Sequence, residues 1–291
     1  MNSSPAYFQR LLDHVLRNIP RVYVYIDDIV ISVDSHEENL QRLEAVFGRF
    51  RQHNLKVKPS KCHIGTGAIT YLGYEISSKG GISPGKAQTE IIKNWPQPNT
   101  TKDIRAFLGL TSFFRRTIKN FSSISAELNK LVRKDSGYRA GPLPAPAARS
   151  FQALKHALIS KPCLQPVNFA KRIIITTDAS ATHYGSCMSQ IGSDNVERPC
   201  GYHSKILSLK ESKQQPGMRE RAALIHALRH WRPYLVGKEF TLRTDHRPNL
   251  KITQGGGNVY DTLSDEIQQY QPFKMEYLQG KKMFIDTRSR Q

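Results

Sequence analysis

The sequence lacks the features that mark several common protein classes. No apolar run approaches the roughly 20 residues of a membrane-spanning helix. The opening residues, M-N-S-S-P-A, contain no apolar secretion signal. Cysteine is scarce, and no two cysteines form the C-x-x-C spacing of a zinc site or redox motif. The four are Cys62, Cys163, Cys187 and Cys200. These absences predict a cytoplasmic protein with reduced thiols and no membrane association.

Acidic residues are also scarce. The 291 residues include 24 acids against 43 Lys and Arg, which gives a net charge of +19. Such an excess suggests a polyanionic partner, most simply nucleic acid, with a membrane surface as the alternative. Hydrophobic residues make up 38% of the chain, enough for about two domains with cores of their own.

The most informative stretch is V-Y-V-Y-I-D-D-I-V-I-S-V at residues 22–33. Two apolar, β-branched runs flank adjacent carboxylates, which predicts a β-hairpin with Asp27 and Asp28 at its tip. Asp-Asp is an acceptable turn pair, so a plain turn is the alternative. A cation would relieve the repulsion between the two charges, and carboxylate oxygens suit Mg²⁺.

Turn and breaker residues divide the chain into segments. A helix is expected over residues 3–18, and another from Ser35, where Glu38 completes a capping box. Two strands are expected near 56–64 and 69–77. The proposed organisation is residues 1–82, an 83–135 region of helices, a linker rich in Pro, Gly and Ala at 136–150, and a second domain at 151–291.

Basic residues gather in the helical region. Arg115, Arg116 and Lys119 are expected to be exposed. A basic helix face often serves only solubility. Because the whole chain is basic, we predict that these three side chains contact nucleic acid.

The second half alternates strands with helices. This pattern predicts an α+β or α/β domain, a mixed sheet with helices packed on it. Strands are expected at 172–177, 185–190, 199–204, 240–244 and 273–278, with helices at 219–230 and 260–270.

Four acids in this half lie at positions where a fold could bring them together. Asp178 and Asp245 directly follow apolar strands, Glu220 lies on a helix, and Asp286 lies near the C-terminus. Each alone reads most simply as a cap for a turn or helix. Neighbouring strand ends and a crossing helix can bring such acids together, and the resulting cluster would be costly without a cation. Paired Mg²⁺ ions would neutralise it and activate water against a phosphodiester.

Several short sequence motifs resemble those of one family. T-D-A-S at 177–180, R-E-R-A-A-L-I-H-A-L-R-H-W-R-P-Y-L at 219–235 and T-D-H-R-P at 244–248 are similar to the RNase H domain of gypsy-type LTR retrotransposon polyproteins. Motifs in the first half resemble the reverse transcriptase of the same polyproteins and occur in the same order. They are S-P-A-Y-F-Q-R-L at 4–11, Y-I-D-D at 25–28, K-C at 61–62, Y-L-G-Y at 71–74, W-P-Q-P at 95–98 and F-L-G-L at 107–110.

The resemblance implies a partial reverse-transcriptase palm, a helical thumb and an RNase H-like domain. It implies that Asp27 and Asp28 hold metals, and that Leu72, Gly73 and Tyr74 grip the primer. It also implies Mg²⁺ (or Mn²⁺) at the RNase H acids, with catalytic roles for all four. The expected partners are an RNA template, a DNA primer and an RNA–DNA hybrid. The expected setting is the cytoplasm, including a virus-like particle, with the nucleus left open.

The sequence also departs from the family pattern. The fingers, the first palm strands and the third palm aspartate are not in the sequence, so DNA synthesis by this chain is expected to be lost. Ile285 directly precedes Asp286, where the family usually has an alanine, and Arg288 replaces a later leucine. A missing residue would turn a helix by about 100°, so Asp286 is expected to miss the metals. A catalytically inert nucleic-acid-binding relic or co-opted protein is the alternative function. We interpret His246 as a local structural residue, and a proton shuttle is the alternative interpretation.

Overall fold

The structure is a computed structural model that describes residues 4–78, 81–160, 162–249, 266–270 and 272–279. The chain forms two compact units, one ending at Gly80 and the other beginning at Gly81. Both units mix helices and strands, as predicted. Nowhere in the described ranges is a helix both long enough and apolar enough to cross a membrane.

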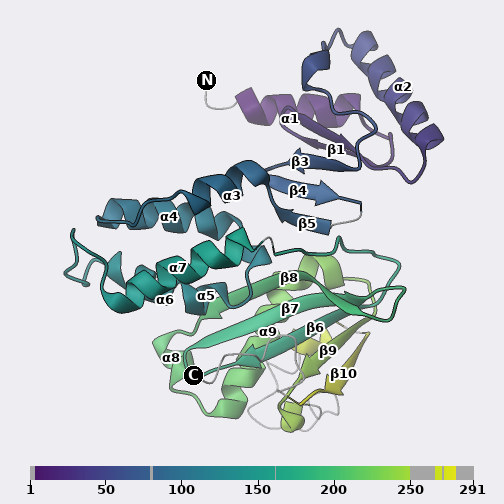
Figure 1. The fold of residues 1–291 in the computed structure, drawn as a ribbon. Helices are drawn as coiled ribbons and strands as arrows, with labels where there is room; N and C mark the ends of the chain where they lie inside the picture. The colour runs from purple at the N-terminus through teal and green to yellow at the C-terminus, as the bar shows by residue number, and fades with distance from the viewer. Residues whose placement is uncertain (1–3, 79–80, 161, 250–265, 271, 280–291) are drawn as a thin grey trace. The chain divides into compact units, whose positions relative to one another are not determined.

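The first unit is built on the predicted hairpin. Helices α1 (Ser4–Val15) and α2 (His36–Gln52) pack with strands β1 (Val22–Tyr25) and β2 (Asp28–Ile31), as Figure 1 shows. The predicted cap of α2 is confirmed, because Ser35 Oγ accepts a hydrogen bond of 3.1 Å from the backbone N–H of Glu38. The buried side chains are Leu12, Val15, Leu16, Val46 and Phe50, with the inward faces of both strands packed against them.

The two strands expected later in this unit need correction. The stretch expected as one strand at 69–77 is a hairpin, β3 (Ala68–Tyr71) and β4 (Tyr74–Ser77). Leu72 and Gly73 form its turn with left-handed φ values of 49° and 76°, a geometry that glycine favours. The strand expected at 56–64 is wrong. A 3₁₀ turn, η1 (Pro59–Lys61), lies there, and its proline has no N–H to give to a sheet.

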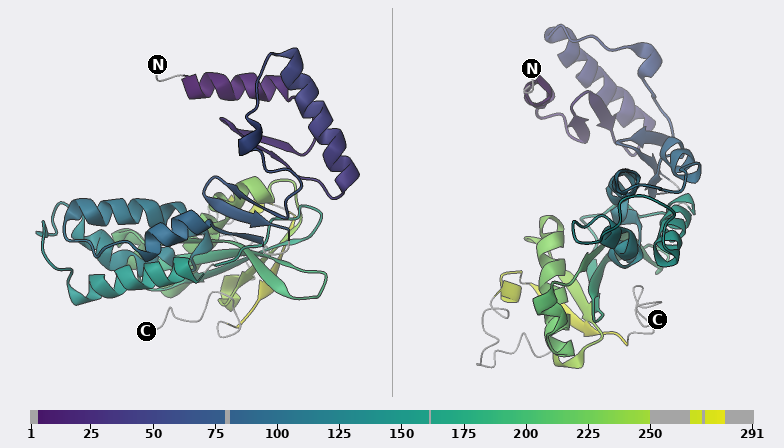
Figure 2. Two further views of the ribbon diagram at one scale, coloured as in Figure 1. Left: turned by 45° about the horizontal axis from the view of Figure 1, so that its top comes forward. Right: turned by 90° about the vertical axis from the view of Figure 1, so that its left-hand side faces the viewer.

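The second unit begins with the short strand β5 (Gly81–Pro84) and a group of helices, seen together in Figure 2. Their apolar faces meet in a common core, where the rings of Phe107 and Phe151 have centroids 4.6 Å apart. The elements are α3 (Lys86–Lys93), α4 (Thr101–Phe113), η2 (Arg115–Thr117), α5 (Phe121–Ile124), α6 (Ala126–Leu131) and α7 (Ala145–Ile159).

The linker predicted at 136–150 does not separate the compact units. Its first part packs back on the helices, since Gly141 N donates to Asn99 O at 2.8 Å and Thr101 N donates to Arg139 O at 3.1 Å. Its second part is the start of α7, with Pro144 at the N-cap. Proline at a helix start removes only an N–H that would have no helical partner, so these prolines begin a helix rather than break one.

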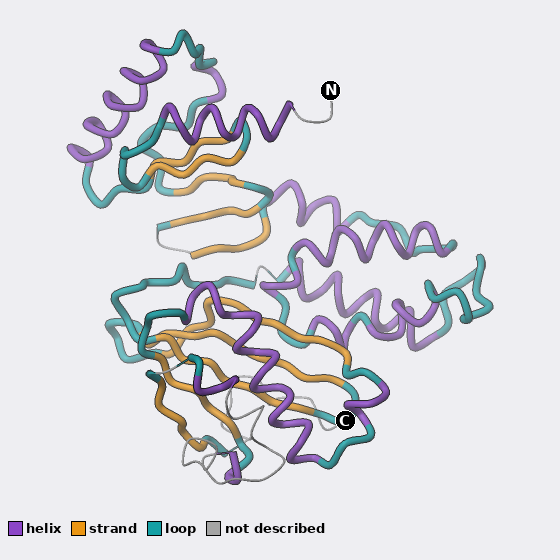
Figure 3. Tube along the Cα trace, turned by 180° about the vertical axis from the view of Figure 1, so that it is seen from behind, coloured by secondary structure: helices purple, strands orange, loops and turns teal. Residues whose placement is uncertain are grey.

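A five-stranded sheet completes the second unit. Its order is β10-β9-β6-β7-β8, with β6 to β8 antiparallel and β9 and β10 parallel to β6. Helix α9 (Pro216–Leu235) crosses one face, as Figure 3 shows from behind, and α8 (Leu209–Ser212) precedes it. The strands overlap all five predicted ones: β6 (Ile173–Ala179), β7 (His183–Ile191), β8 (Glu197–Ile206), β9 (Phe240–Thr244) and β10 (Phe273–Tyr277). Most of the helix expected at 260–270 lies outside the described residues.

Candidate metal centre

Sheet register brings two of the predicted acids to one edge. Parallel strands β6 and β9 are neighbours, and Thr176 is paired with Arg243. Continuing this register by two residues sets Asp178 opposite Asp245, where both strands end. The sequence placed each acid after an apolar strand, and the strand order makes those positions adjacent.

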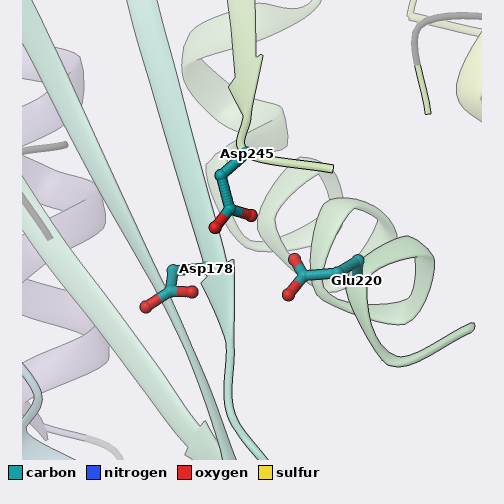
Figure 4. Close-up of side chains that lie close together, drawn as sticks. All are labelled: Asp178, Glu220 and Asp245. Atoms are coloured by element: carbon teal, nitrogen blue, oxygen red, sulfur yellow. The ribbon is translucent and has the colours of Figure 1, made fainter. Parts of the chain in front are cut away.

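Helix α9 supplies the third acid. Glu220 projects from its second turn, and one carboxylate oxygen from each of Asp178, Glu220 and Asp245 lies within 4.8 Å of the others. Figure 4 shows the three carboxylates facing a common space. Asp178 and Glu220 are each only 9% exposed. The predicted convergence of these three acids is therefore present in the fold.

The environment of Glu220 disfavours its charged form. Burial raises the pKa of Glu220 to about 8, with further contributions from the charges of Asp245 and Asp178, although the N–H of Ala179 donates to its carboxylate. Its Oε2 is buried and has no hydrogen-bond partner among the described residues. Three hard oxygen donors with an orphaned oxygen fit a divalent cation such as Mg²⁺, which would relieve both penalties.

The turn after Asp245 is held by its neighbours. The backbone N–H of His246 donates to Thr244 Oγ1 at 3.2 Å, and the N–H of Asn249 donates to His246 O at 3.0 Å. Both bonds use the backbone of His246, so the roles predicted for its side chain, proton shuttle or local structural residue, stay predictions. Asp286, the fourth predicted acid, lies outside the described residues.

The first-unit aspartates lie in a more exposed setting. Tyr25 pairs with Asp28, so the hairpin turn consists of Ile26 and Asp27, one residue earlier than predicted. Ile26 has a left-handed φ of 54°, rare for a β-branched residue, and its N–H donates to Gln9 Oε1 at 2.5 Å. Both carboxylates are exposed, and no third acid joins them among the described residues. A metal at this hairpin stays a prediction.

The predicted primer-gripping residues form the next turn in the same unit. Leu72 and Gly73 connect β3 to β4, and Tyr74 pairs with Tyr71. The pKa of Tyr71 is raised by burial and then by the nearby Asp28 and Tyr25, which shows that this hairpin lies beside the first one. The motifs Y-I-D-D and Y-L-G-Y therefore lie next to each other in the fold. Contact of Leu72, Gly73 and Tyr74 with a primer stays a prediction.

The structure corrects the exposure expected of Arg116. Its guanidinium donates to Tyr234 Oη at 2.9 Å and to Cys200 O at 3.5 Å. It also lies over the rings of Trp231 and Tyr234, 5.8 and 5.3 Å from their centroids. Arg116 thus fastens the helical region to the sheet and α9. The guanidinium is partly buried instead of exposed because two aromatic rings and a carbonyl oxygen surround it and replace its contacts with water.

Two further contacts join the same surfaces. Arg115 donates to Ser204 O at 2.7 Å. Ser122 Oγ donates to the same carbonyl at 2.7 Å and accepts from Ser204 Oγ at 3.2 Å, and the N–H of Ser122 donates to Ser204 Oγ at 2.9 Å. The sequence feature that indicates this close approach is a glycine within a strand. A Cβ on Gly201 would lie 2.9 Å from Arg116 Nε and from a ring carbon of Trp231.

Comparisons with known families agree with this architecture. The family described as "Reverse transcriptase (RNA-dependent DNA polymerase)" matches residues 1–76. The family described as "RNase H-like domain found in reverse transcriptase" matches residues 145–242. The second match includes Asp178 and Glu220 and ends three residues before Asp245.

Relatives with similar sequences are polyproteins. The chain is 32% identical over 282 residues to the "Retrovirus-related Pol polyprotein from transposon 412" of Drosophila melanogaster, covering 96% of this chain and 22% of the relative. It is 31% identical over 251 residues to the "Transposon Tf2-3 polyprotein" of Schizosaccharomyces pombe, covering 85% of this chain and 18% of the relative. The chain thus spans about a fifth of the length of these relatives.

A solved structure shares the fold. The foamy viral protease-reverse transcriptase dRH, in complex with ds DNA, superposes with a TM-score of 0.82 at 22% identity, over 94% of this chain and 49% of that one. The chain thus contains a reverse transcriptase segment and an RNase H-like segment, and its homologues are Pol polyproteins of LTR retrotransposons. The 412 relative is consistent with the gypsy-type resemblance.

Proposed function

We propose that the second unit is a divalent-metal-dependent ribonuclease that cleaves the RNA strand of an RNA–DNA hybrid. The observation that carries this proposal is the convergence of Asp178, Glu220 and Asp245 within 4.8 Å. Paired Mg²⁺ ions at such a cluster supply an activated water and stabilise the leaving oxygen in phosphodiester hydrolysis.

The chain's own residues would divide the work. Asp178 and Asp245 end adjacent parallel strands, so the sheet fixes their spacing. Glu220 sits on a separate element and closes the cluster from the helix side. Because Glu220 is buried and its Oε2 has no partner in the described part of the chain, a cation would satisfy this oxygen.

DNA synthesis is not part of the proposed function. The hairpin of the first unit presents Asp27 and Asp28 without a third acid among the described residues. An inert nucleic-acid-binding protein is the second candidate, and the net charge of +19 favours it independently of the acids. Nuclease assays separate the two candidates, since both bind hybrid and only the first cleaves it.

Metal should stabilise the fold in a pH-dependent way. Glu220 titrates near 4.5 when unfolded and near 8 in the metal-free fold, so this group lowers stability progressively as pH rises from about 4.5 to 8. Mg²⁺ binds the ionised carboxylates, so the rise in Tm on adding Mg²⁺ should be several degrees larger at pH 8.5 than at pH 6. About 1 kcal/mol corresponds to roughly 2–4 °C for a unit of this size. Thermal unfolding with Mg²⁺ or EDTA measures this.

Glu220→Gln is the control for that measurement. It removes the titrating group, so the metal-free variant should lack the pH-dependent loss that the wild type shows between pH 5 and 8. A Tm response to Mg²⁺ that is the same in the variant and the wild type at both pH values would contradict a metal centre at this cluster.

Hybrid binding should weaken steeply with salt. Each phosphate neutralised by Lys or Arg contributes about −0.9 to the slope of log affinity against log salt on a duplex. Arg133 and Lys134 are exposed in the turn that follows α6, whereas Lys130 already pairs with Glu127 at 2.7 Å. We expect Lys134→Ala to reduce the slope by about 0.9, and Lys130→Ala to reduce it less. Fluorescence anisotropy with labelled hybrid across a salt titration measures both, and a flat titration would refute backbone binding.

A further inference from the structure

The side chain that follows Asp245 contacts the first turn of the helix that carries Glu220. The ring of His246 lies against Gly217 in the first turn of α9. A Cβ built on Gly217 would lie 3.0 Å from His246 Cε1 and 3.3 Å from Nε2. Any side chain at residue 217 would therefore push the ring, or the helix, away.

Glycine at this position leaves room for the ring. In a helix interior glycine is about 1 kcal/mol less favourable than alanine, and the first turn carries no reason of its own for a glycine. Gly217 directly follows Pro216, the first residue of α9, and Glu220 follows it by about one helical turn. The absence of a side chain here lets the ring approach the helix backbone close to the Glu220 turn.

The ring also carries an unusual polar atom. His246 Nδ1 is buried and has no hydrogen-bond partner among the described residues. Leaving such an atom unpaired costs about 1–3 kcal/mol. Among the described residues, Nδ1 gives the ring no hydrogen bond, so its packing and the backbone around it hold it there.

That backbone is tied to Asp245. The hydroxyl of Thr244 accepts from His246 N at 3.2 Å and from Asn249 Nδ2 at 3.4 Å, and Asn249 is fully buried. Thr244 ends β9, so the ring has a fixed position relative to the carboxylate of its neighbour Asp245. Its other side contacts the helix of Glu220.

We propose that His246 is a positioning residue for the metal centre, a spacer whose ring against Gly217 sets the separation of Asp245 from Glu220. This inference rests on the proposed function, because the separation matters only if the carboxylates share cations. A change of a few tenths of an ångström at the contact moves one ligand relative to the others. Supporting groups around a metal site typically change its affinity by about 10–100-fold.

Direct Mn²⁺ binding tests this spacer without any assay of activity. Electron paramagnetic resonance of free Mn²⁺ gives the dissociation constant for the whole 291-residue protein. His246→Ala and Gly217→Ala should each weaken Mn²⁺ binding by about 10-fold. His246→Phe keeps a flat ring at the contact without polar atoms, so it should stay within about threefold of wild type, a smaller loss than a broken support.

The two alanine variants should not be additive. In the double variant, the added methyl of residue 217 enters space vacated by the imidazole, so the loss should be no larger than that of the worse single variant. Matched controls are Gly109→Ala, which has open space around its Cβ, and the exposed His156→Ala. Both controls should bind Mn²⁺ as the wild type does. Thermal unfolding in EDTA shows that each variant is folded.

The outcomes separate this inference from the proposed function. If the wild type binds no Mn²⁺, or Asp178→Asn binds it equally well, the metal centre itself is refuted. If the wild type binds and His246→Ala or Gly217→Ala keeps its affinity, the spacer is refuted while the metal centre stands. Loss in His246→Phe as large as in His246→Ala also refutes the spacer, because it assigns the effect to an imidazole nitrogen. An additive double variant refutes the contact.

Discussion

Replacing Asp178 with asparagine should reduce cleavage of an RNA–DNA hybrid by at least about 10²–10³-fold, the scale seen when one charged or polar group is lost from an electrostatic catalytic site. The change keeps the size of the side chain and removes one charge from the cluster within 4.8 Å. A labelled RNA strand annealed to DNA, incubated with Mg²⁺ and resolved on a gel, gives the rate. Asp194→Asn is the matched control, since that acid is exposed and pairs with Arg198.

Several results would decide between the candidate functions. Equal cleavage by the wild type and Asp178→Asn would assign the activity to another site or a contaminant. No cleavage by a folded wild type that binds hybrid would favour the inert protein. Asp286→Asn is expected to have a smaller effect, because the residues around Asp286 depart from the family pattern. If the wild type is inactive, inserting an alanine before Asp286 tests whether the missing residue at this position causes the loss of activity.

Arg116→Ala should lower the free energy of unfolding of the second unit by about 3 kcal/mol. Hydrogen bonds to a charged group contribute about 1.5–3 kcal/mol, and a partly buried cation–π contact about 0.5–2 kcal/mol. The variant loses the bonds to Tyr234 and Cys200 and the contact with Trp231. Urea unfolding followed by tryptophan fluorescence measures the change, with the exposed Arg133→Ala as control.

Arg116→Lys sharpens this measurement. It keeps the positive charge but loses the planar, forked donor, so it should recover less than half of the stability. The affinity of Arg116→Ala for an RNA–DNA hybrid tests the alternative role of this side chain. If Arg116→Ala unfolds like the wild type and binds hybrid more weakly, the side chain contacts nucleic acid, as its sequence context first suggested, and the docking role is refuted.

Local features of the fold were predictable from the sequence where short-range chemistry decides them. The Ser35 cap, the hairpin at Asp27 and the strands of the second half follow from residue type and periodicity. The acids Asp178 and Asp245 could be placed at strand ends in the same way. Their adjacency required the order β9-β6, which the sequence alone does not determine and the family resemblance implied.

Long-range contacts account for the errors. Arg116 contacts Tyr234, 118 residues further along the chain, and nothing near Arg116 in sequence indicates that partner. The prolines around residue 144 predict a break when taken alone, because their position at a helix start depends on the packing of α7. The Gly217 contact with His246 was equally invisible, since a helix glycine without context indicates only lower propensity.

Strand β8 lies at the edge of the sheet, and several of its carbonyls accept hydrogen bonds from other elements. Ser204 O accepts from Arg115 and Ser122, and Pro199 O accepts from Gln165 N at 2.8 Å. An uncovered edge strand is a template for pairing with other chains. A fragment cut at residue 145, where the RNase H-like family match begins, would keep the sheet and discard Arg115 and Ser122. We therefore expect the helical region to protect the sheet from self-association, and a fragment of the second unit that stays monomeric to begin near Gly81.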